Sequence, residues 1–117
     1  MMHNFKELKI WNKAMDVTVE VYKATAAFPT EEKYGLTSQM RRCAVSIPSN
    51  IAEGAGRNSD GQFRHFLGIS NGSCFELETQ LIISNRLELI DDETVEPILQ
   101  QITELQKMNY KLQESKK

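Results

Sequence analysis

The chain has 117 residues, of which 40% are hydrophobic and 26% charged, a composition suited to one domain with a modest core. Fourteen basic and sixteen acidic residues give a formal net charge of -2, so the bulk charge does not favour a nucleic-acid partner. The N-terminal MMHNFKELKI lacks the apolar run of a signal peptide, and no stretch approaches the roughly 18 apolar residues of a membrane span. We therefore expect a cytoplasmic protein with no membrane partner.

The first predicted element is an amphipathic helix at about residues 6–28. Apolar residues recur along it at alternating spacings of three and four, which is the rhythm of one helical face. Two such rows lie side by side: Leu8, Trp11, Met15, Thr18 and Tyr22 in one, and Ile10, Ala14, Val17, Val21 and Ala24 in the other. Together the rows are wider than one bundle core requires, which indicates a surface for a partner.

A second helix is predicted at about residues 31–56, with Thr30 as its N-cap. Its apolar rhythm continues through a proline, along Leu36, Met40, Cys43, Ile47 and Ile51. Pro48 has no amide to bond the carbonyl of Ala44 and presses on it, so we expect a helix kinked at Pro48, at an intrinsic cost of about 3 kcal/mol. The hydroxyls of Ser46 or Ser49 are expected to bond the freed backbone groups.

The third and fourth helices are predicted at about residues 60–88 and 93–114. Ser59 followed by Gln62 matches a capping box, and the cap of the fourth helix is expected between Asp91 and Thr94. Small residues that allow a neighbouring backbone to approach closely fill the middle of the third helix: Gly68, Ser70, Gly72 and Ser73. No strand pattern appears. Short turns between four helices predict an all-α, antiparallel up-down-up-down four-helix bundle, with residues 1–117 as a single domain.

Two stretches of the chain resemble a known family. Residues 34–81 read YGLTSQMRRCAVSIPSNIAEGAGRNSDGQFRHFLGISNGSCFELETQL, and the first helix reads LKIWNKAMDVTVEVYKATAAFP. Both are similar to the proteins encoded by intervening sequences in bacterial 23S ribosomal RNA genes, over roughly residues 8–90. The resemblance implies a four-helix bundle that forms a homopentamer around a central channel, without known enzymatic activity. A more distant resemblance, to the accessory bundle protein of diversity-generating retroelements, implies binding to nucleic acid and to a reverse transcriptase.

The polar residues of the 34–81 segment have two interpretations. In the structural one they bond the carbonyl freed by Pro48 and fix the contact between subunits, because buried charges are tolerated only when paired. In the functional one they form a ligand or nucleic-acid site. Asn50, Glu53 and Arg57 share one helical face, and the last two are spaced for an i,i+4 ion pair. The residues assigned to this motif or interface are Arg41, Arg42, Pro48, Asn50, Glu53, Gly54, Arg57, Gly72, Ser73 and Glu76.

Catalytic and metal sites lack the residues that they need. A ferritin-like di-iron site requires Glu three residues before His on facing helices, and neither His3 nor His65 follows this pattern. The same two histidines would have to serve any nucleophile-His arrangement. The stretch GAGRNSDG has no lysine and no preceding strand, so it predicts a turn instead of a phosphate-binding loop. Cys43 and Cys74 stand alone and are expected in the core. We expect no enzyme, no metal and no cofactor.

The small net charge hides a polarity along the predicted bundle. One end collects the start of the first helix, the turn between the second and third, and the end of the fourth. It holds nine basic and four acidic residues, a net charge of +5, whereas three basic and eight acidic residues give the opposite end -5. The candidate nucleic-acid-binding residues of the positive end are Lys6, Lys9, Lys13, Arg57, Arg64, Lys107 and Lys111. The alternative is that these charges belong to solvated helix ends, where the helix dipoles favour them.

Two functions remain open at the level of sequence. In the first, a homo-oligomer, expected to be a pentamer, binds RNA or a ribonucleoprotein through a ring of basic ends, weakly and without sequence preference. In the second, the oligomer is a structural or protein-interaction scaffold that makes no contact with nucleic acid.

Overall fold

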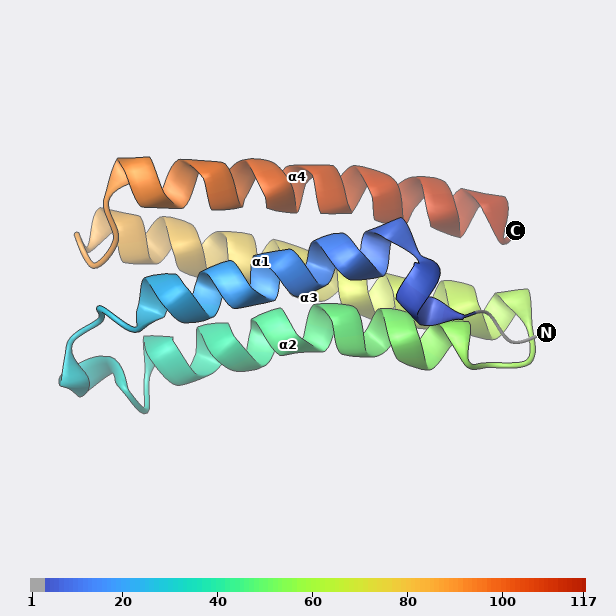
Figure 1. Ribbon diagram of the computed structural model, residues 1–117, viewed down its shortest axis with the longest axis horizontal. Coiled ribbons are helices and arrows are strands. Elements are labelled where there is room, and N and C mark those ends of the chain that lie inside the picture. Colours follow the sequence, from blue (N-terminus) through green and yellow to red (C-terminus); the bar gives the residue numbers. More distant parts are fainter. Residues whose placement is uncertain (1–3) are drawn as a thin grey trace.

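A computed structural model describes residues 4–117, so His3 lies outside the described part of the chain. Four α-helices follow one another: α1 (Lys9–Thr25), α2 (Leu36–Ala55), α3 (Asp60–Arg86) and α4 (Asp92–Ser115). Two short 3-10 turns, η1 (Phe5–Glu7) and η2 (Thr30–Glu32), precede α1 and α2 (Figure 1). The described residues contain no strand, and the prediction of an all-α fold with four helices is confirmed.

Successive helices run in opposite directions in Figure 1, and the molecule measures 45 × 23 × 20 Å. Helices α1 and α3 each pack against both α2 and α4, which closes the four helices into a bundle. The start of α1, the turn between α2 and α3, and the end of α4 lie together at one end, which we call the basic end. The other two connections lie at the acidic end. Within residues 4–117, no helix combines the length and the apolar character needed to cross a membrane.

The two apolar rows predicted on the first helix differ in burial: one lies in the core, and the other, which includes Leu8 and Trp11, only packs against its edge. Ile10, Ala14, Val17 and Val21 are buried between α2 and α4. Met15 and Tyr22, from the other row, are 38% and 41% exposed. The width of this apolar face therefore exceeds what the bundle buries, as the sequence indicated.

The N-caps of α3 and α4 are of the predicted type, and among the predicted caps that of α2 is the exception. The hydroxyl of Ser59 accepts the amide of Gln62 at 3.1 Å, and the carboxylate of Asp91 accepts the amide of Thr94 at 2.8 Å, so both helices have the predicted type of N-cap. The exception is Thr30, which begins η2 instead of capping the second helix. The structure places the start of α2 at Leu36, because the 3-10 turn intervenes.

Candidate nucleic-acid interface and apolar grooves

Pro48 lies buried inside α2, and the neighbouring helix bonds the carbonyl that it frees. The hydroxyl of Thr18 in α1 lies 3.1 Å from the carbonyl oxygen of Ala44 and 2.8 Å from that of Ala14 in its own helix, so its one hydrogen is shared between the two acceptors. The expectation that Ser46 would bond this carbonyl is wrong, because its hydroxyl contacts α3 instead, and Ser49 is exposed. Helix α2 continues through the proline from Leu36 to Ala55, and the kink stays a prediction.

Polar bonds hold α2 against α3. The hydroxyls of Ser46 in α2 and Ser73 in α3 lie 2.9 Å apart, and within α2 the side-chain amide of Asn50 donates to the carbonyl oxygen of Ser46 at 2.8 Å. Deeper in the core, the hydroxyl of Ser70 donates to the carbonyl oxygen of Ile47 at 3.0 Å. The motif residues Asn50 and Ser73 are therefore bonded within one subunit, which favours the structural interpretation for this pair.

The two glycines of the motif differ in their surroundings. A Cβ atom on Gly54 would lie 2.8 Å from the Cβ of Phe66 and 3.2 Å from the carbonyl oxygen of Phe63, so only glycine allows α2 and α3 to approach this closely. A Cβ on Gly72 would meet no heavy atom of the described residues within 4 Å. The prediction that Gly72 permits close helix packing is wrong within the subunit, because this glycine lies on the exposed side of α3.

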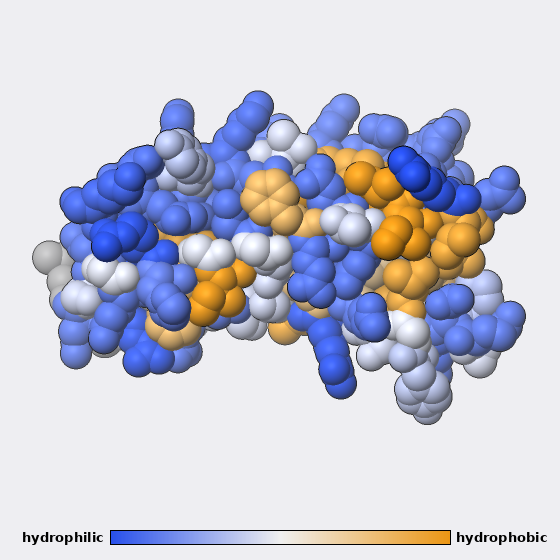
Figure 2. Space-filling model, turned by 180° about the vertical axis from the view of Figure 1, so that it is seen from behind, coloured by the Kyte–Doolittle hydropathy of each residue, from blue (hydrophilic) through white to orange (hydrophobic). Residues whose placement is uncertain are grey.

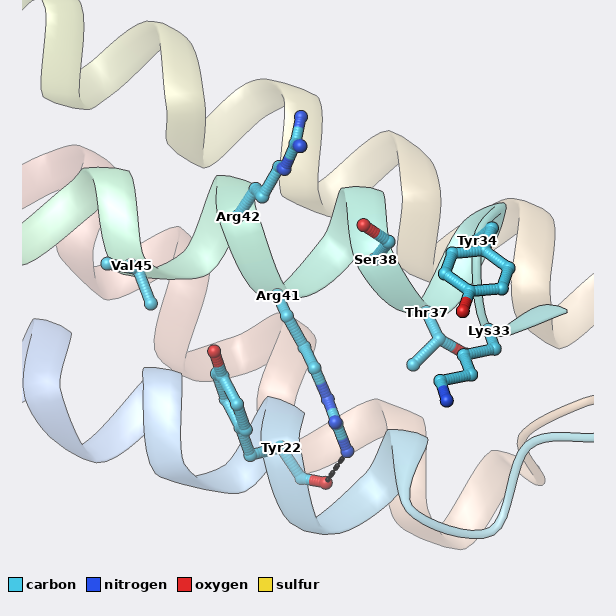
Figure 3. Close-up of a pocket in the computed structure, with 8 residues that line it drawn as sticks. All are labelled: Tyr22, Lys33, Tyr34, Thr37, Ser38, Arg41, Arg42 and Val45. Carbon is cyan, nitrogen blue, oxygen red and sulfur yellow. Dashed lines mark hydrogen bonds between the residues drawn. The ribbon is translucent and has the colours of Figure 1, made fainter. Parts of the chain in front are cut away.

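Arg41 extends from α2 to the C-terminal end of α1 (Figure 3). Its Nε donates to the hydroxyl of Thr25 at 2.9 Å, and its Nη2 donates to the carbonyl oxygen of Tyr22 at 3.1 Å. The guanidinium also lies 4.6 Å from the centre of the Tyr22 ring. A cation is favoured at the carbonyls that end a helix, so Arg41 fastens the two helices together.

Two further motif residues lie on the outer surface. Arg42 points away from α1 in Figure 3 and is exposed. Glu76 of α3 is also exposed and accepts a hydrogen bond from the side chain of Gln80 at 3.4 Å. No ion pair within residues 4–117 includes either of them. Both charges are therefore available to a partner.

Two candidate cations of the basic end are neutralised by carboxylates. Arg57 pairs with Glu53 at 2.7 Å, which confirms the predicted i,i+4 ion pair. Lys13 pairs with Glu104 of α4 at 2.5 Å, and this bond lowers the pKa of the glutamate. Neither cation is free to neutralise a phosphate without giving up its partner.

The other candidates form no ion pair with a carboxylate in the part of the chain that the structure describes. Arg64 donates to the carbonyl oxygen of Lys116 at the end of α4, at 2.7 Å, so it fastens α3 to α4 without meeting a carboxylate there. No ion pair among the described residues includes four of the predicted lysines, which are Lys6, Lys9, Lys107 and Lys111. The structure thus reduces the predicted set of seven to a smaller group of uncompensated charges at the start of α1 and near the end of α4.

An uncharged groove runs between α1 and α2. It has a volume of about 340 Å³, and its walls include Phe5, Trp11, Met15, Val45, Pro48 and Ala52. None of its lining residues is charged. We call it the α1–α2 groove. Its lining includes Trp11, Met15 and Thr18 from the second apolar row of α1, together with the buried proline of the motif.

A second groove lies between α3 and α4, and sequence reasoning missed it. It has a volume of about 620 Å³, and its walls include Asn71, Phe75, Gln106, Lys107, Tyr110 and Lys111. Phe75 and Tyr110 are 52% and 63% exposed. The signal was present in the sequence, because Lys107, Tyr110 and Lys111 recur at the i, i+3 and i+4 positions of one helical face. We call this the α3–α4 groove.

The outer face of α3 adds further apolar surface. Figure 2 looks onto it and shows a large hydrophobic area near the acidic end, with smaller ones along the helix. The exposed residues of α3 that contribute apolar side chains are Ile69, Phe75, Ile82 and Ile83. A face of this kind commonly marks a contact with another molecule.

The cysteines are buried, as predicted. Cys43 is 6% and Cys74 1% exposed. Burial raises the pKa of each thiol to about 12, and the nearby Glu76 carboxylate adds to the shift at Cys43. Protonated thiols are poor nucleophiles and poor metal ligands. Within residues 4–117, no cluster of three or more His, Cys, Asp or Glu side chains is arranged to hold a metal ion.

Comparisons with known proteins agree with this architecture. The family model described as 23S rRNA-intervening sequence protein matches residues 6–111. A crystal structure of a protein of unknown function from the S23 ribosomal protein family of Bacteroides thetaiotaomicron is similar, with 25% sequence identity and a TM-score of 0.79. The similarity covers 88% of this chain and 96% of that one. A search of curated proteins finds no match. Neither description names a reaction.

Proposed function

The chain belongs to the 23S rRNA-intervening sequence protein family, and from this premise we propose that it is a non-enzymatic, homo-oligomeric protein that binds RNA through its basic end. The observation that carries the proposal is the group of uncompensated lysines there, Lys6, Lys9, Lys107 and Lys111. An acidic chain can bind a polyanion when its positive charges gather at one end, because charges are screened over about 8 to 10 Å at physiological salt.

Assembly would multiply this charge. The α1–α2 groove offers apolar walls without a charged residue, which is the composition of the centre of a protein interface. If copies pack side by side around one axis with the same polarity, their basic ends form a ring. The family resemblance leads us to expect five copies.

A scaffold that does not bind RNA is the second candidate. It is favoured by Lys13 and Arg57, whose carboxylate partners remove two of the predicted cations. In this case the remaining lysines keep the helix ends solvated, and the protein acts through its apolar surfaces alone.

The RNA proposal is tested by comparing two variants that each lose three positive charges, one at the basic end and one at the acidic end. The triple variant Lys9→Gln, Lys107→Gln, Lys111→Gln removes three uncompensated cations of the basic end. Its control removes three cations from the acidic end and consists of Lys23→Gln, Lys33→Gln and Arg86→Gln.

Fluorescence anisotropy with a labelled RNA would measure affinity as a function of salt. We expect the affinity of the parent to fall steeply with salt. The basic-end variant should bind more weakly and have a smaller slope of log affinity against log salt concentration, because each lost phosphate contact removes about 0.7 to 0.9 from that slope. The control should keep the slope of the parent. Equal losses in the two variants, or no binding by the parent at low salt, would favour the scaffold.

Self-association has its own test at Met15, which lies in the α1–α2 groove and is 38% exposed. Met15→Glu places a charge in the proposed interface while leaving the core intact. Val19→Glu is the control, because Val19 is also exposed on α1 but does not line this groove. Sedimentation should show a multiple of the 13.4 kDa chain for the parent and the control, and dissociation for Met15→Glu. A parent that is a stable monomer at micromolar concentration would rule out assembly, and a dimer would rule out the pentamer.

A further inference from the structure

We propose that the α3–α4 groove binds single-stranded RNA, with bases stacked on Phe75 and Tyr110 and phosphates held by Lys107 and Lys111. This inference rests on the proposed function and deepens it, because it names the form of RNA and adds a base-binding surface to the phosphate contacts of the basic end.

The aromatic and basic residues converge on one groove from two helices. On α4, Lys107, Tyr110 and Lys111 are spaced at i, i+3 and i+4, so they share one face. On α3, Phe75 lines the facing wall. Both rings are more than half exposed, although their apolar surface would favour burial. Exposed aromatic rings beside lysines are the pairing that single-stranded nucleic acid uses, through base stacking and backbone neutralisation.

Neither lysine of the groove forms an ion pair with a carboxylate of residues 4–117, although Lys107 lies close enough to Glu104 to help lower the pKa of that glutamate. Glu104 is bonded by Lys13 of α1, and Glu114 by Lys117 at 2.9 Å. No ion pair in the described chain includes Lys107 or Lys111. Two positive charges therefore remain at the rim of a mainly apolar surface.

One polar atom in the groove also lacks a partner. The side-chain oxygen of Asn71 is buried and accepts no hydrogen bond from the described residues. That oxygen has almost no accessible surface, so a donor of the RNA would reach it only if the amide side chain turned toward the groove. The neighbouring carboxylate of Glu78 accepts a hydrogen bond from the side-chain amide of Gln106 at 3.0 Å, which leaves its negative charge in place.

The charges of the two grooves favour different occupants. Lysine is depleted at the centre of protein interfaces, and the α1–α2 groove accordingly has no charged lining residue. The α3–α4 groove has two lysines and two exposed rings, which suits a polyanion with flat apolar faces better than a second copy of this chain. A single strand is required because a duplex keeps the faces of its bases stacked inside the helix.

The experiment compares one labelled RNA of mixed sequence as a single strand and as a duplex, with the full chain in its native assembly. Phe75→Leu and Tyr110→Leu retain apolar volume but remove the aromatic face. Tyr34→Leu is the matched control, because Tyr34 is an aromatic residue that is 88% exposed at the acidic end. Anisotropy titrations over a range of salt and sedimentation of every variant are the measurements.

We expect the parent to prefer the single strand. Each groove variant should weaken single-strand binding by about 5- to 100-fold. The salt slope should stay unchanged in these variants, because the phosphate contacts remain, and duplex binding and the oligomeric state should also be unaffected. The pair Lys107→Gln, Lys111→Gln should instead lower the salt slope by about one to two. Tyr34→Leu should match the parent throughout.

Three results would overturn the inference. If the parent binds duplex and single strand equally and the groove variants change neither, the basic end binds RNA but the groove does not, so the proposed function survives. If the groove variants dissociate the oligomer, the groove is an interface between copies. If the parent binds no RNA even at low salt, the proposed function fails together with this inference.

Discussion

Replacing Gly54 with alanine should destabilise the bundle, although alanine is the better helix former. The new Cβ would lie 2.8 Å from the Cβ of Phe66, against an ordinary contact of at least 3.4 Å. Phe66 cannot relieve this contact by changing rotamer, because its Cβ is fixed to the backbone of α3. The helices must therefore separate locally by roughly 0.6 Å, the difference between the two distances.

The magnitude follows from two opposed effects. Overpacking of this kind costs about 1 to 3 kcal/mol, and a clash between backbone-fixed atoms belongs at the upper end. The gain in helix propensity from glycine to alanine is about 1 kcal/mol. We expect a net loss of about 2 kcal/mol in the free energy of unfolding.

Gly68→Ala is the matched control, because a Cβ on Gly68 meets no atom of the described chain within 4 Å. Only the gain in propensity then remains, and this variant should be more stable than the parent by about 1 kcal/mol. Urea denaturation at one fixed protein concentration would measure both, since assembly makes stability depend on concentration. If Gly54→Ala is as stable as Gly68→Ala, the close approach of α2 and α3 does not depend on the missing side chain.

Three other predictions test individual features of the structure. Thr18→Val removes the hydroxyl that reaches the Ala44 carbonyl, and because its hydrogen is shared with the nearer Ala14 carbonyl, the loss should be about 1 kcal/mol. The loss should be smaller in a Pro48→Ala background, where the restored amide bonds the Ala44 carbonyl; a double-mutant cycle by urea denaturation that shows no coupling would contradict this. Glu88, at the end of α3, has a φ of 62°, a left-handed conformation that glycine adopts without strain. Glu88→Gly should therefore raise the free energy of unfolding by about 1 kcal/mol, and an unchanged urea midpoint would contradict this prediction. The pKa of both Cys43 and Cys74 is raised from 9.0 to about 12, so the folded protein keeps protons that the unfolded chain loses. The free energy of unfolding should therefore fall as pH rises from about 9 to 12, and it should fall less steeply when both cysteines are replaced by alanine. Identical pH profiles for the parent and this variant would show that the cysteines do not cause the fall.

The sequence by itself determined the features that depend on neighbours along the chain. The number of helices followed from the 3.6-residue rhythm, which is a property of the helix alone. The caps at Ser59 and Asp91 and the ion pair of Glu53 with Arg57 join residues three or four positions apart, and the structure confirms them. The apolar surplus on the first helix was also visible, since it required only counting the rows.

The tertiary structure decided everything that depends on the neighbour in space. Both apolar rows of α1 fit one helix equally well, and only packing against α2 and α4 buries the row of Ala14 while leaving that of Met15 half-buried or exposed. The motif residues of α2 were recognised, but their partners on other helices were not.

The same limit applies to the candidate site, where the basic end was predicted and its pairing was not. Lys13 forms an ion pair with a carboxylate of α4. The α3–α4 groove is lined by residues of two helices that lie more than thirty positions apart in the sequence. Helix periodicity fixes the face on which a residue lies, but the rotation and height of each helix against the next come from the fit of all side chains in the core. That fit is a property of the whole bundle, and no local pattern contains it.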